Sequence, residues 1–171
     1  MTKSASKLLL IYTGGTIGMI KEEDSGTLKA FNFDELLSKI PEIKLLDHQI
    51  DTLSFDKPID SSNFGLIEYR KLAQIITEHY DRYDGFVVLH GSDTMAYTAS
   101  FLSFMLENLN KPVILTGAQL PLGVLRSDGR ENFINAIEIA SAHDDGTPRV
   151  PEVAIYFENK LYRGNRSTKV N

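Results

Sequence analysis

A threonine hydroxyl directly behind a glycine pair is the first feature of this sequence that suggests chemistry. The stretch LLLIYTGGTIGMI leads from a short apolar run into Gly14, Gly15 and Thr16. Glycines let the backbone turn tightly and bring its amide groups close to a ligand. A hydroxyl behind such a turn is well placed for nucleophilic attack, provided that another group activates it. For an isolated GGT, a tight turn without catalytic purpose is the more common interpretation.

The same glycines do not fit the two common phosphate-binding patterns. Gly14, Gly15 and Gly18 miss the G-x-G-x-x-G spacing of a dinucleotide fingerprint, and no Gly-Lys-Ser/Thr follows as in a phosphate loop. A dinucleotide-binding module is therefore the least favoured function.

Three other polar segments follow expected strands: DSSN at Asp60–Asn63, HGSDT at His90–Thr94 and TGAQ at Thr116–Gln119. Taken singly, aspartate and serine at such places are good helix caps, and His90 is more often a structural histidine than a catalyst. In open α/β sheets, however, ligands bind beyond the carboxyl ends of the strands. Four successive strand ends, including the one before Thr16, predict a polar site along one rim of a sheet.

The elements that would position these residues alternate between strands and helices. Continuous apolar runs are typical of strands buried on both faces, and they occur at Leu8–Ile11, Phe86–Leu89, Val113–Leu115 and Val153–Phe157, with a further strand expected around His48–Phe55. Apolar spacings of three and four predict helices over Leu66–Tyr83, Asp93–Leu109 and Asp128–Ala140, the last with Asp128 as its cap. This alternation predicts an α/β fold with three layers, a mostly parallel sheet and helices on both faces.

Composition excludes several classes of function. The chain has 171 residues and a net charge of −5 with both signs interspersed, so no basic surface for nucleic acid is expected. It has no cysteine, which excludes disulfides and thiolate metal sites, and its four histidines lack a metal-ligand spacing. No apolar run reaches the length of a membrane span or a signal-peptide core. A single cytoplasmic domain that acts on a small molecule or a protein is expected.

The motifs together carry a specific resemblance. YTGGTIG, DSSN, LHGSDTMAYTAS, LTGAQLPLGVLRSDGRENFINA and LYRGNRSTK resemble, in order and over nearly the whole chain, the amino-terminal domain of bacterial cytoplasmic (type I) L-asparaginases. The resemblance implies a Rossmann- or flavodoxin-like fold and hydrolysis of the side-chain amide of L-asparagine to L-aspartate and ammonia, with no cofactor or metal. It implies a homo-oligomer, dimer or tetramer, for the full-length protein. Residues 1–171 would be the catalytic domain, with the family's smaller C-terminal domain absent from this chain.

The resemblance also implies roles for particular residues. Thr16 would be the nucleophile that forms a β-aspartyl intermediate, and the second catalytic constellation would be Ser92, Asp93 and Lys169. Chemically, a lysine amine can take a proton from a neighbouring hydroxyl or water, while a carboxylate holds the geometry or binds an ammonium group. The implied substrate-binding residues are Asp60, Ser61, Ser62, Ser92, Asp93 and Ala118, with the backbone around Ala118 helping to stabilise the oxyanion.

Two departures from the family pattern bear on these roles. Most relatives have threonine at the position of Ser92, and the missing methyl group leaves the serine rotamer freer. Many relatives have a lid tyrosine that contacts the nucleophile, whereas the lid candidate Lys21–Lys29 places Thr27 there, and no tyrosine lies between Tyr12 and Tyr69. The activation of Thr16 is therefore unexplained from this chain.

Three alternatives stay open. The chain ends two residues after Lys169, so it is also interpreted as a truncated domain that binds an amino acid without turning it over. The other two are a glutaminase and a subunit of a tRNA-dependent amidotransferase. Such relatives usually carry an additional N-terminal segment, and Leu8 is expected to lie too near the start of the chain for one.

Overall fold

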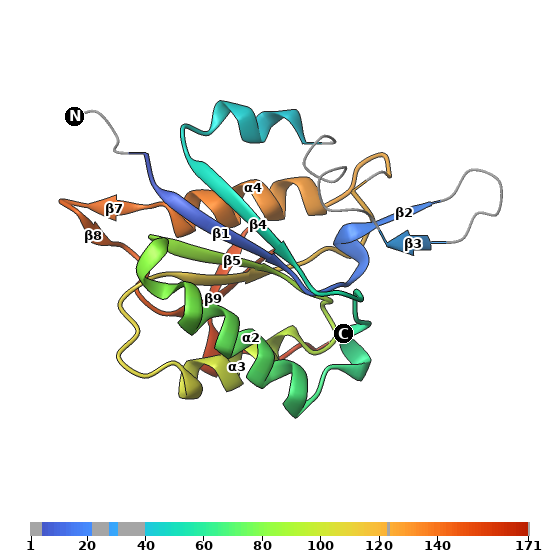
Figure 1. Ribbon diagram of the computed structural model, residues 1–171. Helices are drawn as coiled ribbons and strands as arrows, with labels where there is room; N and C mark the ends of the chain where they lie inside the picture. The colour runs from blue at the N-terminus through green and yellow to red at the C-terminus, as the bar shows by residue number, and fades with distance from the viewer. Residues whose placement is uncertain (1–4, 22–27, 31–39, 123, 171) are drawn as a thin grey trace.

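A six-stranded sheet forms the centre of the protein in the computed structural model, which describes residues 5–21, 28–30, 40–122 and 124–170 (Figure 1). From one edge to the other, the strands are β4 (Gln49–Ser54), β1 (Lys7–Tyr12), β5 (Gly85–Leu89), β6 (Val113–Thr116), β9 (Val153–Phe157) and β10 (Lys160–Arg163). The first five are parallel, and β10 pairs antiparallel with β9. Counted along the chain, the parallel strands lie in the order 2-1-3-4-5, which is the flavodoxin-like order.

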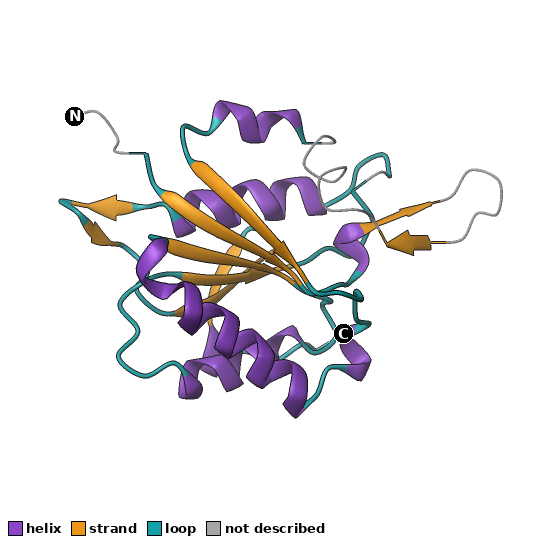
Figure 2. Cartoon of the chain, in the orientation of Figure 1, coloured by secondary structure: helices purple, strands orange, loops and turns teal. Residues whose placement is uncertain are grey.

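Helices cover both faces of this sheet, as Figure 2 shows. Helices α2 (Leu66–His79) and α3 (Met95–Met105) lie on one face, and α4 (Gly129–Ala140) lies on the other (Figure 1). The predicted three-layer α/β architecture is confirmed. None of the helices in the described part of the chain has the length and hydrophobicity needed to cross a bilayer.

The alternation of side chains along β1 explains the three layers. Leu8, Leu10 and Tyr12 belong to the core cluster under α4, whereas Leu9 and Ile11 belong to the cluster under α2 and α3. Successive side chains of a strand point to opposite faces, so a strand covered on both sides needs apolar residues at every position. This is why the apolar run is continuous.

Shorter elements connect these layers. Two antiparallel hairpins pair β2 (Met19–Lys21) with β3 (Leu28–Ala30) and β7 (His143–Asp144) with β8 (Thr147–Pro148). The second hairpin turns through Asp145 and Gly146, both with positive φ, as a type I′ hairpin turn requires. Single 3-10 turns are formed by η1 (Thr16–Gly18), η2 (Pro41–Leu45), η3 (Ser61–Asn63), η4 (Tyr80–Arg82) and η5 (Gly164–Arg166).

All three predicted helices need correction in part. The helix expected over 66–83 is α2, which ends at His79 and is followed by the 3-10 turn η4. The helix expected over 93–109 is α3, which begins only at Met95 and ends at Met105. Asp128 precedes α4 but makes no side-chain cap; its carboxylate instead accepts hydrogen bonds from the backbone amides of Gln119 and Leu120. A capping pattern is recognised from neighbouring residues alone. In the folded chain, the amides of the loop after β6 lie close to Asp128 and bind its carboxylate instead.

Candidate active site

The turn after β1 can be made only by glycine. Gly14 and Gly15 have φ values of +133° and +89°, which residues with a Cβ rarely adopt. A Cβ on Gly14 would lie 2.2 Å from the carbonyl oxygen of Ile59, and one on Gly15 would lie 2.5 Å from the amide nitrogen of Gly91. The two glycines therefore let three strand exits touch, and Thr16, half-buried, begins the 3-10 turn that follows.

The turn after β4 is attached to the same place. The amide of Ile59 donates to the carbonyl oxygen of Thr13 at 2.9 Å. Ser61 is only 3% exposed, and its hydroxyl faces Gly91, where an added Cβ would approach to 2.5 Å. Its carbonyl oxygen accepts a 2.7 Å hydrogen bond from the hydroxyl of Thr94. The DSSN segment is thus fixed against the exits of both β1 and β5.

Asp60 is exposed and is held as a carboxylate. Its Oδ1 accepts hydrogen bonds from the backbone amide and the hydroxyl of Ser62, both at 2.9 Å. These two donors, the backbone amide first, hold the pKa of Asp60 below its usual range. Asp60 and Ser62 therefore present negative charge and hydroxyl oxygen to solvent at this rim.

Ser92, Asp93 and Lys169 meet at the exit of β5. The ammonium group of Lys169 donates to Ser92 Oγ at 3.1 Å and to Asp93 Oδ1 at 2.7 Å. The side chain of Asp93 is 65% exposed and that of Lys169 is 33% exposed. Residues separated by more than 75 positions are therefore brought into direct contact, in the combination that the motifs predict.

His90 is a structural residue of this exit. It is fully buried, its Nε2 lies 2.9 Å from the hydroxyl of Thr98, and its ring packs at 4.5 Å from that of Phe64. Its Nδ1 lies 2.8 Å from the carbonyl oxygen of Gly91, which can only accept, so the proton is on Nδ1. Burial lowers the pKa of His90 to about 4, which keeps the ring neutral at pH 7.

We expect His90 to make the fold sensitive to mild acid. An unfolded histidine binds a proton near pH 6.5, whereas folded His90 does so near pH 4, so the unfolded chain binds more protons between these values. Stability should therefore fall by about 3 kcal/mol as pH drops from 6.5 to 4. Urea unfolding across this range should show a flatter pH dependence in His90→Gln; an equal slope in both proteins would contradict the assignment.

The turn after β6 completes the rim. A Cβ on Gly117 would lie 2.4 Å from the carbonyl oxygen of His90, so the turns after β5 and β6 are packed against each other. Ala118 is buried, which leaves its backbone as the part that could serve a ligand. The next residue, Gln119, is exposed, and its Nε2 donates to Ser92 Oγ at 3.3 Å.

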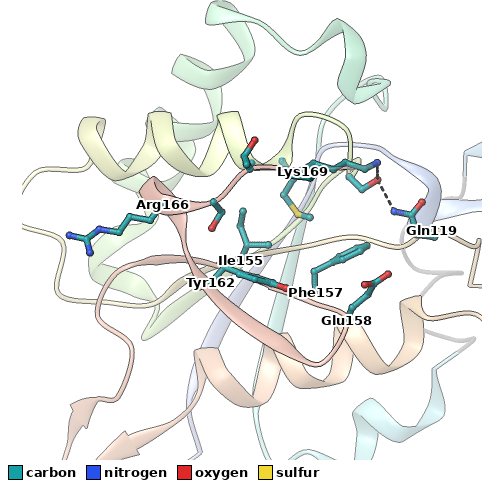
Figure 3. A pocket seen from close by; sticks show the side chains of 13 residues that line it. Gln119, Ile155, Phe157, Glu158, Tyr162, Arg166 and Lys169 are labelled. Carbon is teal, nitrogen blue, oxygen red and sulfur yellow. Dashed lines mark hydrogen bonds between the residues drawn. The ribbon is translucent and has the colours of Figure 1, made fainter.

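A pocket of about 440 Å³ lies beside the rim (Figure 3). Figure 3 shows the side chains of Gln119 and Lys169 reaching toward one another, and Ile155 and Phe157 among the apolar residues of the lining. Of the predicted catalytic residues, Ser92 and Lys169 line this pocket, whereas Thr16 and Asp93 do not. The predicted site is therefore a rim that joins several loops rather than this single hollow.

Most of the predicted residues thus lie at the carboxyl ends of the parallel strands. They gather at the switch point between β1 and β5, where the chain leaves β1 toward one side of the sheet and leaves β5 toward the other. Thr27 and most of the lid candidate Lys21–Lys29 lie outside the described residues. Gln119 was placed at a strand exit by the sequence, but no signal identified its contact with Ser92. Within the described ranges, no three histidine, aspartate or glutamate side chains gather as a metal site requires.

The chain is similar to known proteins over most of its length. The family described as "Asparaginase, N-terminal" matches residues 7–171. L-asparaginase 1 of Escherichia coli K12 is 46% identical over 165 residues, which cover 96% of this chain and 47% of that protein. The 60 kDa lysophospholipase of Mus musculus is 45% identical over 186 residues, covering 96% of this chain and 32% of that protein. The chain spans about half the length of the bacterial relative.

A solved structure is also similar to this chain, in its fold as well as its sequence. The crystal structure of L-asparaginase I from Vibrio cholerae superposes with a TM-score of 0.87 at 43% identity, covering 98% of this chain and 49% of that one. This chain superposes on about half of the Vibrio protein, so its fold corresponds to one part of that protein.

Proposed function

The chain belongs to the asparaginase family, whose N-terminal domain it matches, and on this premise we propose that it carries the catalytic groups of an L-asparaginase. Residues 1–171 would form the N-terminal catalytic domain. The observation that carries the proposal is the contact of Lys169 with Ser92 and Asp93, 3.1 Å and 2.7 Å long, beside the glycine turn that presents Thr16.

In the proposed reaction, the oxygen of the Thr16 hydroxyl attacks the side-chain amide carbon of L-asparagine. The bond from that carbon to nitrogen breaks, ammonia leaves with the proton of the hydroxyl, and a β-aspartyl ester with Thr16 remains. Water then attacks the ester, which releases L-aspartate and returns the proton to Thr16. Asparagine and water are consumed, aspartate and ammonia are formed, and no oxidant or reductant is needed.

Proton transfer during these steps would depend on Lys169, Ser92 and Asp93. The lysine amine lies in hydrogen-bonding contact with the Ser92 hydroxyl, so a proton can pass between them when a substrate or water is activated. Asp93 holds the lysine by an ion pair, which fixes its direction. Backbone amides near Ala118 would stabilise the negative charge that develops on the amide oxygen.

The charges of the rim fit the ends of an amino acid. Asp60 and Asp93 offer carboxylates for an α-ammonium group, and the hydroxyl of Ser62 lies beside Asp60 to contact an α-carboxylate. Ser61 would act through its buried packing against Gly91, which fixes the turn. The name of the mouse relative points to a lipid ester, but these charged groups favour a small zwitterion over an acyl chain.

The proposal is tested by incubating the 171-residue chain with L-asparagine, L-glutamine and a lysophospholipid in parallel. We expect ammonia and L-aspartate in equal amounts from asparagine, faster than ammonia from glutamine. Faster release from glutamine would replace the proposal with a glutaminase. Stabilisation of the chain by L-aspartate without any turnover would replace it with an amino-acid-binding domain.

The resemblance to bacterial cytoplasmic relatives extends the proposal beyond the site. We propose that the protein acts in the cytoplasm, without nucleic acid or membrane partners, and that its full-length form is a homo-oligomer. The interspersed charges and the net charge of −5 support the absence of nucleic-acid partners, because they offer no basic surface for phosphates.

A further inference from the structure

Building on the proposed function, we propose that Gln119 is a positioning residue that fixes the hydroxyl of Ser92. Gln119 touches neither the Thr16 turn nor the Asp60 turn in any described contact. It acts through Ser92, which is the group that faces Lys169.

The geometry around Ser92 Oγ gives the direction of its hydrogen. Oγ accepts one hydrogen bond from Lys169 Nζ at 3.1 Å and a second from Gln119 Nε2 at 3.3 Å. A hydroxyl oxygen has two lone pairs and one hydrogen, and a charged ammonium group can only donate. Both lone pairs are therefore engaged, and the O–H bond of Ser92 points away from both donors.

Gln119 is itself held in place by α4. Its backbone amide donates to the two carboxylate oxygens of Asp128 at 2.9 Å and 3.1 Å. The buried Asn132 donates to Asp128 at 3.2 Å and to the carbonyl oxygen of Gly117 at 3.0 Å. This network uses the carboxylate that would otherwise cap α4, which explains why the expected cap is absent. It anchors the turn from which the Gln119 side chain reaches Ser92.

A serine at position 92 needs such a contact more than a threonine would. Serine has one heavy atom on Cβ and can occupy three staggered χ1 rotamers, whereas a β-branched side chain is restricted by its own shape. Lys169 is a long side chain with 33% of its surface exposed, so its contact alone leaves Ser92 room to rotate. A second donor from an anchored turn selects one rotamer.

The test compares Gln119→Met with Ser92→Thr and with the double variant. Methionine keeps the length of the side chain but cannot donate. Losing one hydrogen bond corresponds to about fivefold, so we expect kcat for asparagine to fall about fivefold with little change in KM. In the Ser92→Thr background, the same change should cost less than about twofold, because the branched side chain keeps its own rotamer. Gln74→Met, which removes an exposed hydrogen bond to Glu78, is the matched control.

A measurement that needs no turnover separates this inference from the proposed function. The NMR couplings between Hα and Hβ of Ser92 should show a single χ1 rotamer in the parent chain and averaged values in Gln119→Met. Averaged couplings in the parent, or unchanged couplings in the variant, would overturn the inference whether or not asparagine is hydrolysed. Equal losses of kcat in the serine and threonine backgrounds would overturn it too. Absent turnover with the expected couplings would instead reject the proposed function alone.

Discussion

Replacement of Thr16 by alanine should abolish ammonia release from L-asparagine, with a loss in kcat of at least about 1,000-fold. The reason is chemical: alanine has no oxygen to form the β-aspartyl ester, and no other side chain occupies the end of the Gly14–Gly15 turn. The fold should remain, because Thr16 is half-buried at the start of a short 3-10 turn and packs no core. Steady-state ammonia release measures the effect.

Two controls make this result specific. Thr16→Ser keeps the hydroxyl and should keep measurable turnover. Thr13→Val removes a hydroxyl three residues away, which donates to the carbonyl oxygen of Leu89 at 2.9 Å. That oxygen still accepts the backbone amide of Thr13, so we expect a loss of about 1 kcal/mol in stability and little change in kcat. Full activity in Thr16→Ala would show that Thr16 is not the nucleophile. L-aspartate should still raise the melting temperature of Thr16→Ala, which shows that its site is formed.

The sequence predicts the elements of this fold better than their long-range contacts. The apolar run at Leu8–Ile11 identifies β1 because both faces of that strand are covered, and the same pattern identifies β5, β6 and β9. Strand β10 was not predicted: all four of its residues are exposed, so no burial pattern marks it. Its pairing with β9 comes from backbone hydrogen bonds, to which side-chain type contributes little.

The candidate site shows the same division. The motifs place Ser92, Asp93 and Lys169 among the site residues, and the fold brings them into contact. The contact of Gln119 with Ser92 depends on Asp128 crossing to another loop, which no local pattern encodes. The local pattern predicts that this carboxylate caps a helix, because the sequence alone does not show which distant backbone amides bind it in the folded chain.

Replacement of Lys169 by methionine should lower kcat by about 100- to 10,000-fold, the range that a positioned acid–base group contributes. Methionine keeps the aliphatic stem but removes the group that contacts Ser92 and Asp93. The melting temperature should change little, because partly exposed ion pairs contribute about 0–1 kcal/mol to stability. Lys71→Met is the matched control: its 3.4 Å ion pair with Asp56 involves none of the predicted site residues, and its loss should leave kcat unchanged.

Lys169→Arg then separates the two roles that a lysine can have here. Arginine keeps the positive charge and its attraction to Asp93, but its guanidinium group does not give up a proton in proteins. If Lys169 transfers protons through Ser92, the arginine variant should be about as inactive as the methionine variant. If Lys169 only supplies charge, arginine should restore most of the activity. We expect the first result, since the 3.1 Å contact with the Ser92 hydroxyl gives the lysine a direct route for the proton, whereas the contact with Asp93 alone would suffice for charge. Substantial activity in Lys169→Arg would assign the lysine an electrostatic role and leave the group that transfers the proton to be found in another part of the site.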